Sequence, residues 1–102
     1  MRSVRIHAAA AEEVAEAAAW YEKERPGLGA DFERAVDAVL DLLEEEIVPL
    51  VSVPGTAGTR GVQRLLLRRF PYALIVRESV GEIVVIAFAH TARRPGYWRG
   101  RR

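Results

Sequence analysis

The chain has 102 residues, of which 50% are hydrophobic and 28% charged, with a net charge of +1 and no cysteine. This length suits one domain over residues 1–102, and the composition is that of a folded protein. Without cysteine there are no disulfides or thiolate metal sites, and His7 and His90 lie too far apart in sequence to suggest a zinc centre. No apolar run approaches the ~20 residues that span a bilayer, and acidic residues follow the N-terminus too soon for a secretory signal. We therefore expect a soluble, cytoplasmic protein that needs no metal or cofactor.

Charge is divided unevenly along the sequence. Residues 1–59 contain 5 basic and 12 acidic residues, a net charge of −7, whereas residues 60–102 contain 10 arginines and only Glu78 and Glu82, a net charge of +8. A GC-rich genome would explain the preference for arginine over lysine but not this separation. It suggests that the basic half binds a polyanion or an acidic protein segment, since arginine pairs bidentately with phosphate and carboxylate.

The first half of the chain predicts one strand and two helices. Residues 3–8 alternate in the manner of a short strand. The segment 9–25 is rich in Ala and Glu at helical spacing and ends before Pro26, and we expect its first turn to be acidic. Residues 30–46 form a second amphipathic pattern after the turn PGLG. Because this turn is short, the helices should form an antiparallel hairpin.

The second half predicts a three-stranded meander. An irregular connection over residues 49–60 precedes strands at 61–69, 72–79 and 82–90, with tight turns at 70–71 and 79–81. The last strand contains a continuous apolar run, as expected of an interior strand. The simplest assembly is an α+β domain of order β-α-α-β-β-β, with a mainly antiparallel sheet and the helical hairpin packed on one face.

The C-terminal sequence FAHTARRPGYWRGRR supplies candidates for chemistry on RNA. Attack of a ribose 2′-OH on the neighbouring phosphate needs a base, cations on the phosphate oxygens and a proton donor. His90 is the acid/base candidate, because histidine is the residue type that ordinarily titrates near neutrality. Arg64, Arg77 and Arg93 could clamp the phosphate, and Tyr97 offers a phenol. These five residues form the candidate catalytic set.

Other residues in this half are candidates for binding RNA or a protein partner: Arg68, Arg69, Arg94 and Trp98. Each candidate also has a structural interpretation. His90 could cap a strand and bond a backbone carbonyl, and Tyr97 and Trp98 could pack on the core or cover the sheet edge. We expect the last arginines to form a solvated tail: Arg99, Arg101 and Arg102.

Three segments resemble one known family in their order and spacing: WYEKERPGLGADF, RRFPYALIVRE and IVVIAFAHTARRPGYW. Together they are similar to toxins of bacterial type II toxin–antitoxin modules in the RelE/ParE superfamily, often labelled plasmid stabilisation proteins. The resemblance covers nearly the whole chain. It implies a RelE/ParE-like fold and a growth-inhibiting toxin that is neutralised by a cognate antitoxin.

The same resemblance implies two different targets. RelE-like members enter the ribosome and cut mRNA, whereas ParE-like members poison DNA gyrase. We favour mRNA cleavage by a metal-independent endoribonuclease (an mRNA interferase), because the basic half combines arginines with His90 and Tyr97. A gyrase inhibitor without nuclease activity and an inactive antitoxin-binding relic are the alternatives. In all three cases we expect an acidic or amphipathic antitoxin segment to cover the basic sheet.

Overall fold

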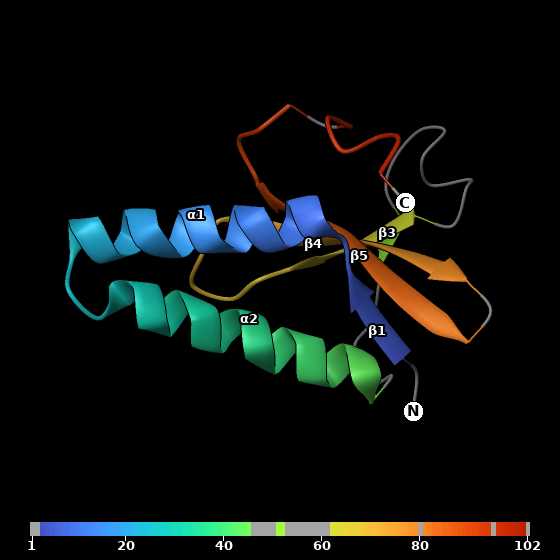
Figure 1. Ribbon diagram of the computed structural model, residues 1–102, viewed down its shortest axis with the longest axis horizontal. Helices are drawn as coiled ribbons and strands as arrows, with labels where there is room; N and C mark the ends of the chain where they lie inside the picture. The colour runs from blue at the N-terminus through green and yellow to red at the C-terminus, as the bar shows by residue number, and fades with distance from the viewer. Residues whose placement is uncertain (1–2, 46–50, 53–61, 80, 95, 102) are drawn as a thin grey trace.

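The structure is a computed structural model that describes residues 3–45, 51–52, 62–79, 81–94 and 96–101. Two helices pack on one face of a sheet whose strand order is β1-β5-β4-β3-β2 (Figure 1). The elements follow the chain in this order: β1 Ser3–Ile6, α1 Ala8–Glu24, α2 Leu28–Glu44, β2 Val51–Ser52, β3 Val62–Leu66, β4 Tyr72–Ser79 and β5 Glu82–His90. The predicted α+β class is confirmed. The two-residue β2 lies within the stretch expected to be irregular, and the rest of that stretch, 49–50 and 53–60, falls outside the described residues.

Helix α1 begins one residue earlier than predicted because His7 caps it. The His7 backbone is extended, and its Nδ1 accepts the Ala9 N–H at 3.0 Å. The first turn therefore contains only alanines, and the prediction of an acidic first turn is wrong. At the other end Arg25 is extended, as the residue before a proline prefers to be, so the helix ends at Glu24. Neither described helix is long and apolar enough to cross a membrane.

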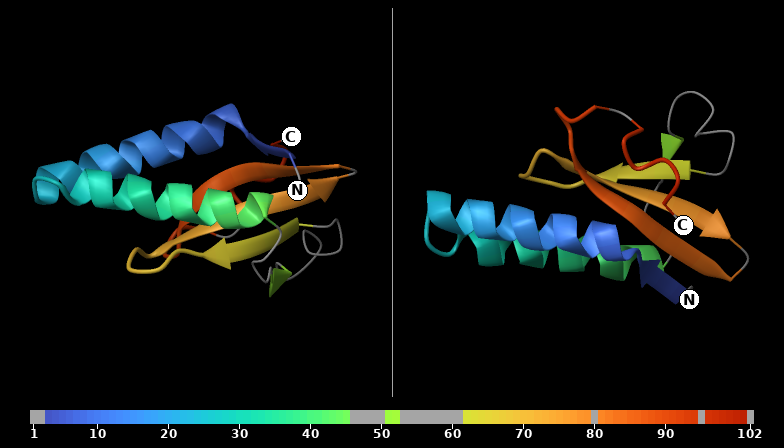
Figure 2. Two further views of the ribbon diagram at one scale, coloured as in Figure 1. Left: turned by 90° about the horizontal axis from the view of Figure 1, so that it is seen from below. Right: turned by 45° about the horizontal axis from the view of Figure 1, so that its top comes forward.

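The two helices lie side by side along one face of the sheet (Figure 2). Glu22 fixes the turn between them, because its carboxylate accepts the N–H groups of Gly27 at 3.0 Å and Gly29 at 3.1 Å. These bonds start α2 at Leu28, two residues before the predicted position. A Cβ on Gly29 would lie 2.6 Å from the carbonyl oxygen of Ala18, so the close approach of the helices requires glycine there.

Strand β5 is interior, as its apolar run predicted. It pairs in parallel with β1, from Ser3↔Glu82 to Ile6↔Val85, and antiparallel with β4. The helix face of the sheet carries one apolar cluster, which includes Leu74, Val85 and Phe88 and the α2 residue Phe32. The outer face carries a second cluster of sheet residues together with Trp98. Both faces of β5 are therefore buried.

A β-bulge interrupts β5 at Ile86. Ile75 is paired with Ala87 and Val76 with Val85, so Ile86 is an extra residue opposite β4. The pairing with β1 stops at Val85. On the β1 side, within the part of the chain that the structure describes, β5 has no neighbouring strand from residue 86 onward.

The hairpin between β3 and β4 turns earlier than predicted. Strand β3 ends at Leu66 rather than at residue 69. The Leu67 N–H donates to the Tyr72 carbonyl at 2.9 Å, and the Tyr72 N–H donates to the Phe70 carbonyl at 2.8 Å. Arg69 adopts a positive φ of 71° inside this loop. The predicted turn at 70–71 is thus the end of a longer loop.

Candidate functional site

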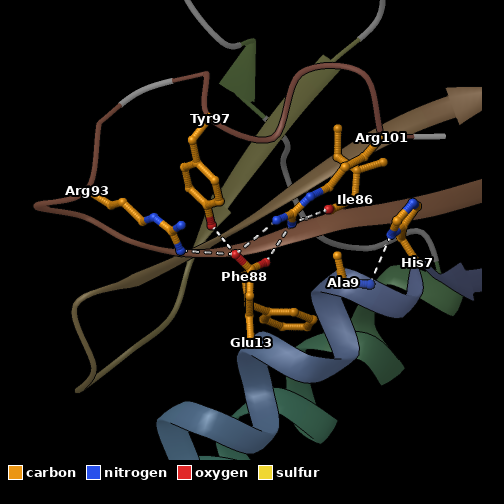
Figure 3. Close-up of polar contacts among 8 residues, drawn as sticks. All are labelled: His7, Ala9, Glu13, Ile86, Phe88, Arg93, Tyr97 and Arg101. Atoms are coloured by element: carbon orange, nitrogen blue, oxygen red, sulfur yellow. Dashed lines mark hydrogen bonds and ion pairs between the residues drawn. The ribbon is translucent and has the colours of Figure 1, made fainter.

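The carboxylate of Glu13 is the centre of a polar cluster between α1 and the C-terminal residues (Figure 3). Its side chain is only 10% exposed. One oxygen accepts the Phe88 N–H at 3.1 Å and an Arg101 N–H at 2.8 Å. The other accepts the Tyr97 hydroxyl at 2.5 Å and lies 3.4 Å from the Arg93 guanidinium. One largely buried carboxylate is thus shared by two arginines, a phenol and a backbone amide.

This cluster completes the open side of β5. Arg101 donates to the Ile86 carbonyl at 3.0 Å with the same nitrogen that bonds Glu13. The Ile86 carbonyl and the Phe88 N–H both lie beyond the last residue that pairs with β1. A buried backbone group without a partner is costly. Glu13 therefore accepts the Phe88 N–H and Arg101 donates to the Ile86 carbonyl, in place of the hydrogen bonds that a neighbouring strand would make.

The C-terminal segment, defined as residues 91–94 and 96–101, lies against the outer face of the sheet. Trp98 is 4% exposed and packs in the outer cluster, with Tyr97 against its border. The Thr91 N–H donates to the Pro71 carbonyl at 2.8 Å, which ties the start of the segment to the β3–β4 loop. Trp98 thus packs on the outer face of the sheet, and its ring presents little surface to a ligand.

Tyr97 is held on both its hydroxyl and its ring. Burial, followed by the hydrogen bond to Glu13, raises the pKa of Tyr97 well above the ordinary value for a phenol. The guanidinium carbon of Arg93 lies 3.7 Å from the centre of its ring. Because the proton is donated to Glu13 and one ring face is covered by Arg93, Tyr97 is a structural partner of the cluster in this conformation.

A cavity of about 280 Å³, the outer-face cavity, lies between the C-terminal segment and the outer face of the sheet. Its floor is aliphatic and comprises Leu66, Ala73, Ile75 and Ala89. Its rim carries His90 and four arginines: Arg64, Arg93, Arg94 and Arg99. None of the ion pairs among the described residues involves Arg64, Arg94 or Arg99. The cavity therefore combines an apolar floor with unneutralised positive charge.

The structure brings most of the predicted site residues to this cavity. The following line its wall: Arg64, His90, Arg93, Arg94, Tyr97 and Trp98. Arg77 does not line the cavity. It lies near the far end of β4, where it pairs with Val84, whereas His90 pairs with Tyr72 at the start of β4. Five residues of strand, about 16 Å of backbone, separate these two rows, so Arg77 and His90 arise from distant parts of the sheet.

The other two predicted binding residues lie in the β3–β4 loop. Arg68 is exposed there and is not on the cavity wall. Arg69 lies 3.9 Å from Asp31 of α2, and its guanidinium carbon lies 5.4 Å from the centre of the Phe70 ring. Arg69 therefore connects the loop to the helical hairpin.

His90 closes the end of β5. Its Nδ1 accepts the Ala92 N–H at 3.0 Å, and its ring packs edge-on against Tyr72 with the ring centres 5.2 Å apart. The pKa of Tyr72 is raised above the ordinary value for a phenol, mainly because the side chain is partly buried. His90 thus bonds to the backbone at the end of the strand, but the predicted carbonyl partner is wrong, because Nδ1 accepts an N–H group.

Sequence reasoning missed Glu13 and misplaced Arg101. The prediction that Arg101 lies in a solvated tail is wrong, because its side chain is only 20% exposed. Arg99 is exposed, as predicted, and Arg102 lies outside the described residues. A signal for Glu13 exists, because it lies at helical spacing between the buried Ala10 and Ala17. Across the described ranges no group of three or more His, Asp or Glu residues is arranged to hold a metal ion.

The fold resembles that of a solved toxin–antitoxin structure. A solved structure described as "Chromosomal ParDE TA system from P. aeruginosa" has the same fold, with a TM-score of 0.74 over 88% of this chain and 96% of that chain. The sequence identity is 19%, so the likeness shows the fold, in agreement with the predicted RelE/ParE-like architecture. No model of a known protein family matches the chain, and no curated protein matches it.

Proposed function

We propose that this chain is the toxin of a type II toxin–antitoxin module. We further propose that its target is DNA gyrase, which it inhibits by binding rather than by catalysing a reaction. The fold likeness to a ParDE toxin–antitoxin system supports the toxin role. The sequence resemblance to RelE/ParE toxins supports it independently. Gyrase is the target that the resemblance implies for ParE-like members.

The observation that carries the choice of mechanism is the position of the candidate acid and base groups. The Tyr97 hydroxyl donates to Glu13, and His90 uses one ring nitrogen to bond the Ala92 amide. Arg77 lies about 16 Å along the sheet from His90. Groups that already hold the chain's own C-terminal segment are poorly placed to act on a scissile phosphate. This arrangement supports inhibition by binding over the mRNA cleavage that sequence reasoning favoured.

Two assays on purified chain separate the mechanisms. The first measures supercoiling of relaxed plasmid by gyrase, and the second maps cleavage of ribosome-bound mRNA by primer extension. We expect inhibition of supercoiling, equal for the wild type and for His90→Ala, and no mRNA cleavage. Cleavage that disappears in His90→Ala would refute the proposed mechanism.

A pulse of expression in cells tests the toxin role itself. Incorporation of labelled thymidine should stop before incorporation of labelled amino acids, and the Tyr97→Phe variant should retain this order. A chain that leaves growth and both incorporations unchanged is not a toxin, and the inactive antitoxin-binding relic would then replace the proposal.

A further inference from the structure

We infer that the outer-face cavity docks an acidic partner segment that carries one branched aliphatic anchor, with the anchor on the floor and carboxylates on the rim. This inference rests on the proposed function, since the natural partner is the antitoxin of that module. It names the chemistry by which the partner is recognised and the place where it binds.

The floor of the cavity is shaped by two short side chains. Ala73 and Ala89 are directly paired across β4 and β5 on the outer face. Beside them Ile75 is buried, whereas Leu66 at the end of β3 is 56% exposed. The paired alanines leave a hollow, and Leu66 leaves apolar surface at its side. Covering that surface with another aliphatic side chain removes it from water, which is favourable.

The rim of the cavity carries charge that the described part of the chain does not neutralise. Glu13 pairs with Arg93 and Arg101, but Arg64, Arg94 and Arg99 take part in none of the ion pairs among the described residues. Guanidinium groups bind carboxylates bidentately, and unneutralised arginines around an apolar hollow favour an anionic partner. Charge complementarity therefore selects an acidic segment.

The aromatic residues at the cavity favour a peptide over a nucleic acid. Single-stranded nucleic acids bind largely by stacking bases on exposed aromatic rings. Trp98 is 4% exposed, and one face of the Tyr97 ring is covered by the Arg93 guanidinium 3.7 Å away. What remains open is an aliphatic hollow of about 280 Å³, which has ample room for one branched aliphatic side chain. The occupant that matches is an acidic peptide.

The test is a binding titration with a defined probe: a short fluorescein-labelled peptide of Asp, Glu and Ser with one leucine at its centre. Fluorescence anisotropy should show binding to the folded chain. Replacing the leucine by serine should weaken binding about tenfold, because the anchor no longer covers the floor. The Leu66→Asp variant should have a similar effect, and because Leu66 is exposed, a thermal melt should confirm that this variant folds.

A matched pair of charge reversals tests the rim. Arg94→Glu, at the cavity, should weaken binding about fivefold or more, whereas Arg68→Glu, in the same basic half but off the cavity wall, should change it less than about twofold. Equal losses for the two variants would mean diffuse attraction and would overturn the docking site. So would undiminished binding of the serine peptide, no binding of the leucine peptide, or tighter Leu66-dependent binding of an oligouridylate.

The titration involves neither growth nor gyrase, so the two proposals can fail separately. A chain that binds the leucine peptide at the cavity but leaves growth unchanged retains the docking site and refutes the toxin role. A chain that inhibits growth but does not bind the peptide refutes the docking site alone.

Discussion

Replacing Glu13 by glutamine removes the charge at the centre of the polar cluster while keeping the size of the side chain. The Phe88 N–H keeps a carbonyl acceptor, but Arg101, whose side chain is 20% exposed, loses its counter-charge, and the Tyr97 hydroxyl loses a charged acceptor. A hydrogen bond to a charged group contributes about 1.5–3 kcal/mol. The Arg93 contact, with a side chain 54% exposed, adds little. We expect Glu13→Gln to lower the free energy of unfolding by about 2 kcal/mol and Tm by about 10 °C.

The matched control is Glu16→Gln, which removes a charge from the same helix at an exposed position. It should change the free energy of unfolding by less than about 0.5 kcal/mol. Urea unfolding followed by circular dichroism measures both variants, and a double-mutant cycle with Arg101→Gln should give a coupling of about 1 kcal/mol or more. Equal destabilisation by Glu13→Gln and Glu16→Gln, or a coupling near zero, would refute the structural role assigned to the cluster.

Three further predictions concern ionisation and packing. Burial raises the pKa of every tyrosine in the chain above the ordinary value of 10.0: Tyr21, Tyr72 and Tyr97. Phenolate absorbance at pH 10 should therefore be small in the folded chain and about half-maximal in denaturant. The free energy of unfolding should fall as the pH rises above 10, and it should fall less steeply in the Tyr97→Phe variant. Trp98→Ala should lower the free energy of unfolding by about 3 kcal/mol. Trp20→Ala, at a position 57% exposed, should lower it by less than about 1 kcal/mol. Equal losses for the two variants in urea unfolding would contradict the packing described for Trp98. Gly29→Ala should cost about 2 kcal/mol because its Cβ would meet the Ala18 carbonyl, and an unchanged Tm would show that the helices separate without penalty.

The main elements of the fold were predictable from local patterns. The spacing of apolar residues in α2 and the continuous run in β5 depend on neighbours within a few positions, and both elements were confirmed. The start of α1 was one residue off because His7 is an unusual capping residue. The bulge at Ile86 was not predictable, since an uninterrupted apolar run gives no sign of where the alternation changes phase.

The candidate site was predictable only in part. The charge separation indicated that one end of the sheet is cationic, and most of the chosen residues do line the outer-face cavity. Glu13 was missed because its partners are 75 to 88 residues away along the chain, and no local pattern connects them. Arg101 was misjudged for the same reason, since a terminal arginine beside glycine has the sequence signature of a solvated tail.

The bond between Glu13 and Arg101 has a consequence for the order in which the protein matures. These residues are 88 positions apart, and β1 pairs with a strand that begins 79 residues after it. During synthesis the helical hairpin can form early from local contacts, but the first strand waits for residues 82–85 and the Glu13 carboxylate for Arg101. The outer-face cavity, whose wall is the C-terminal segment, accordingly forms later than the hairpin. A newly made chain therefore becomes competent to bind through this surface only after Arg101 has been added and has reached Glu13.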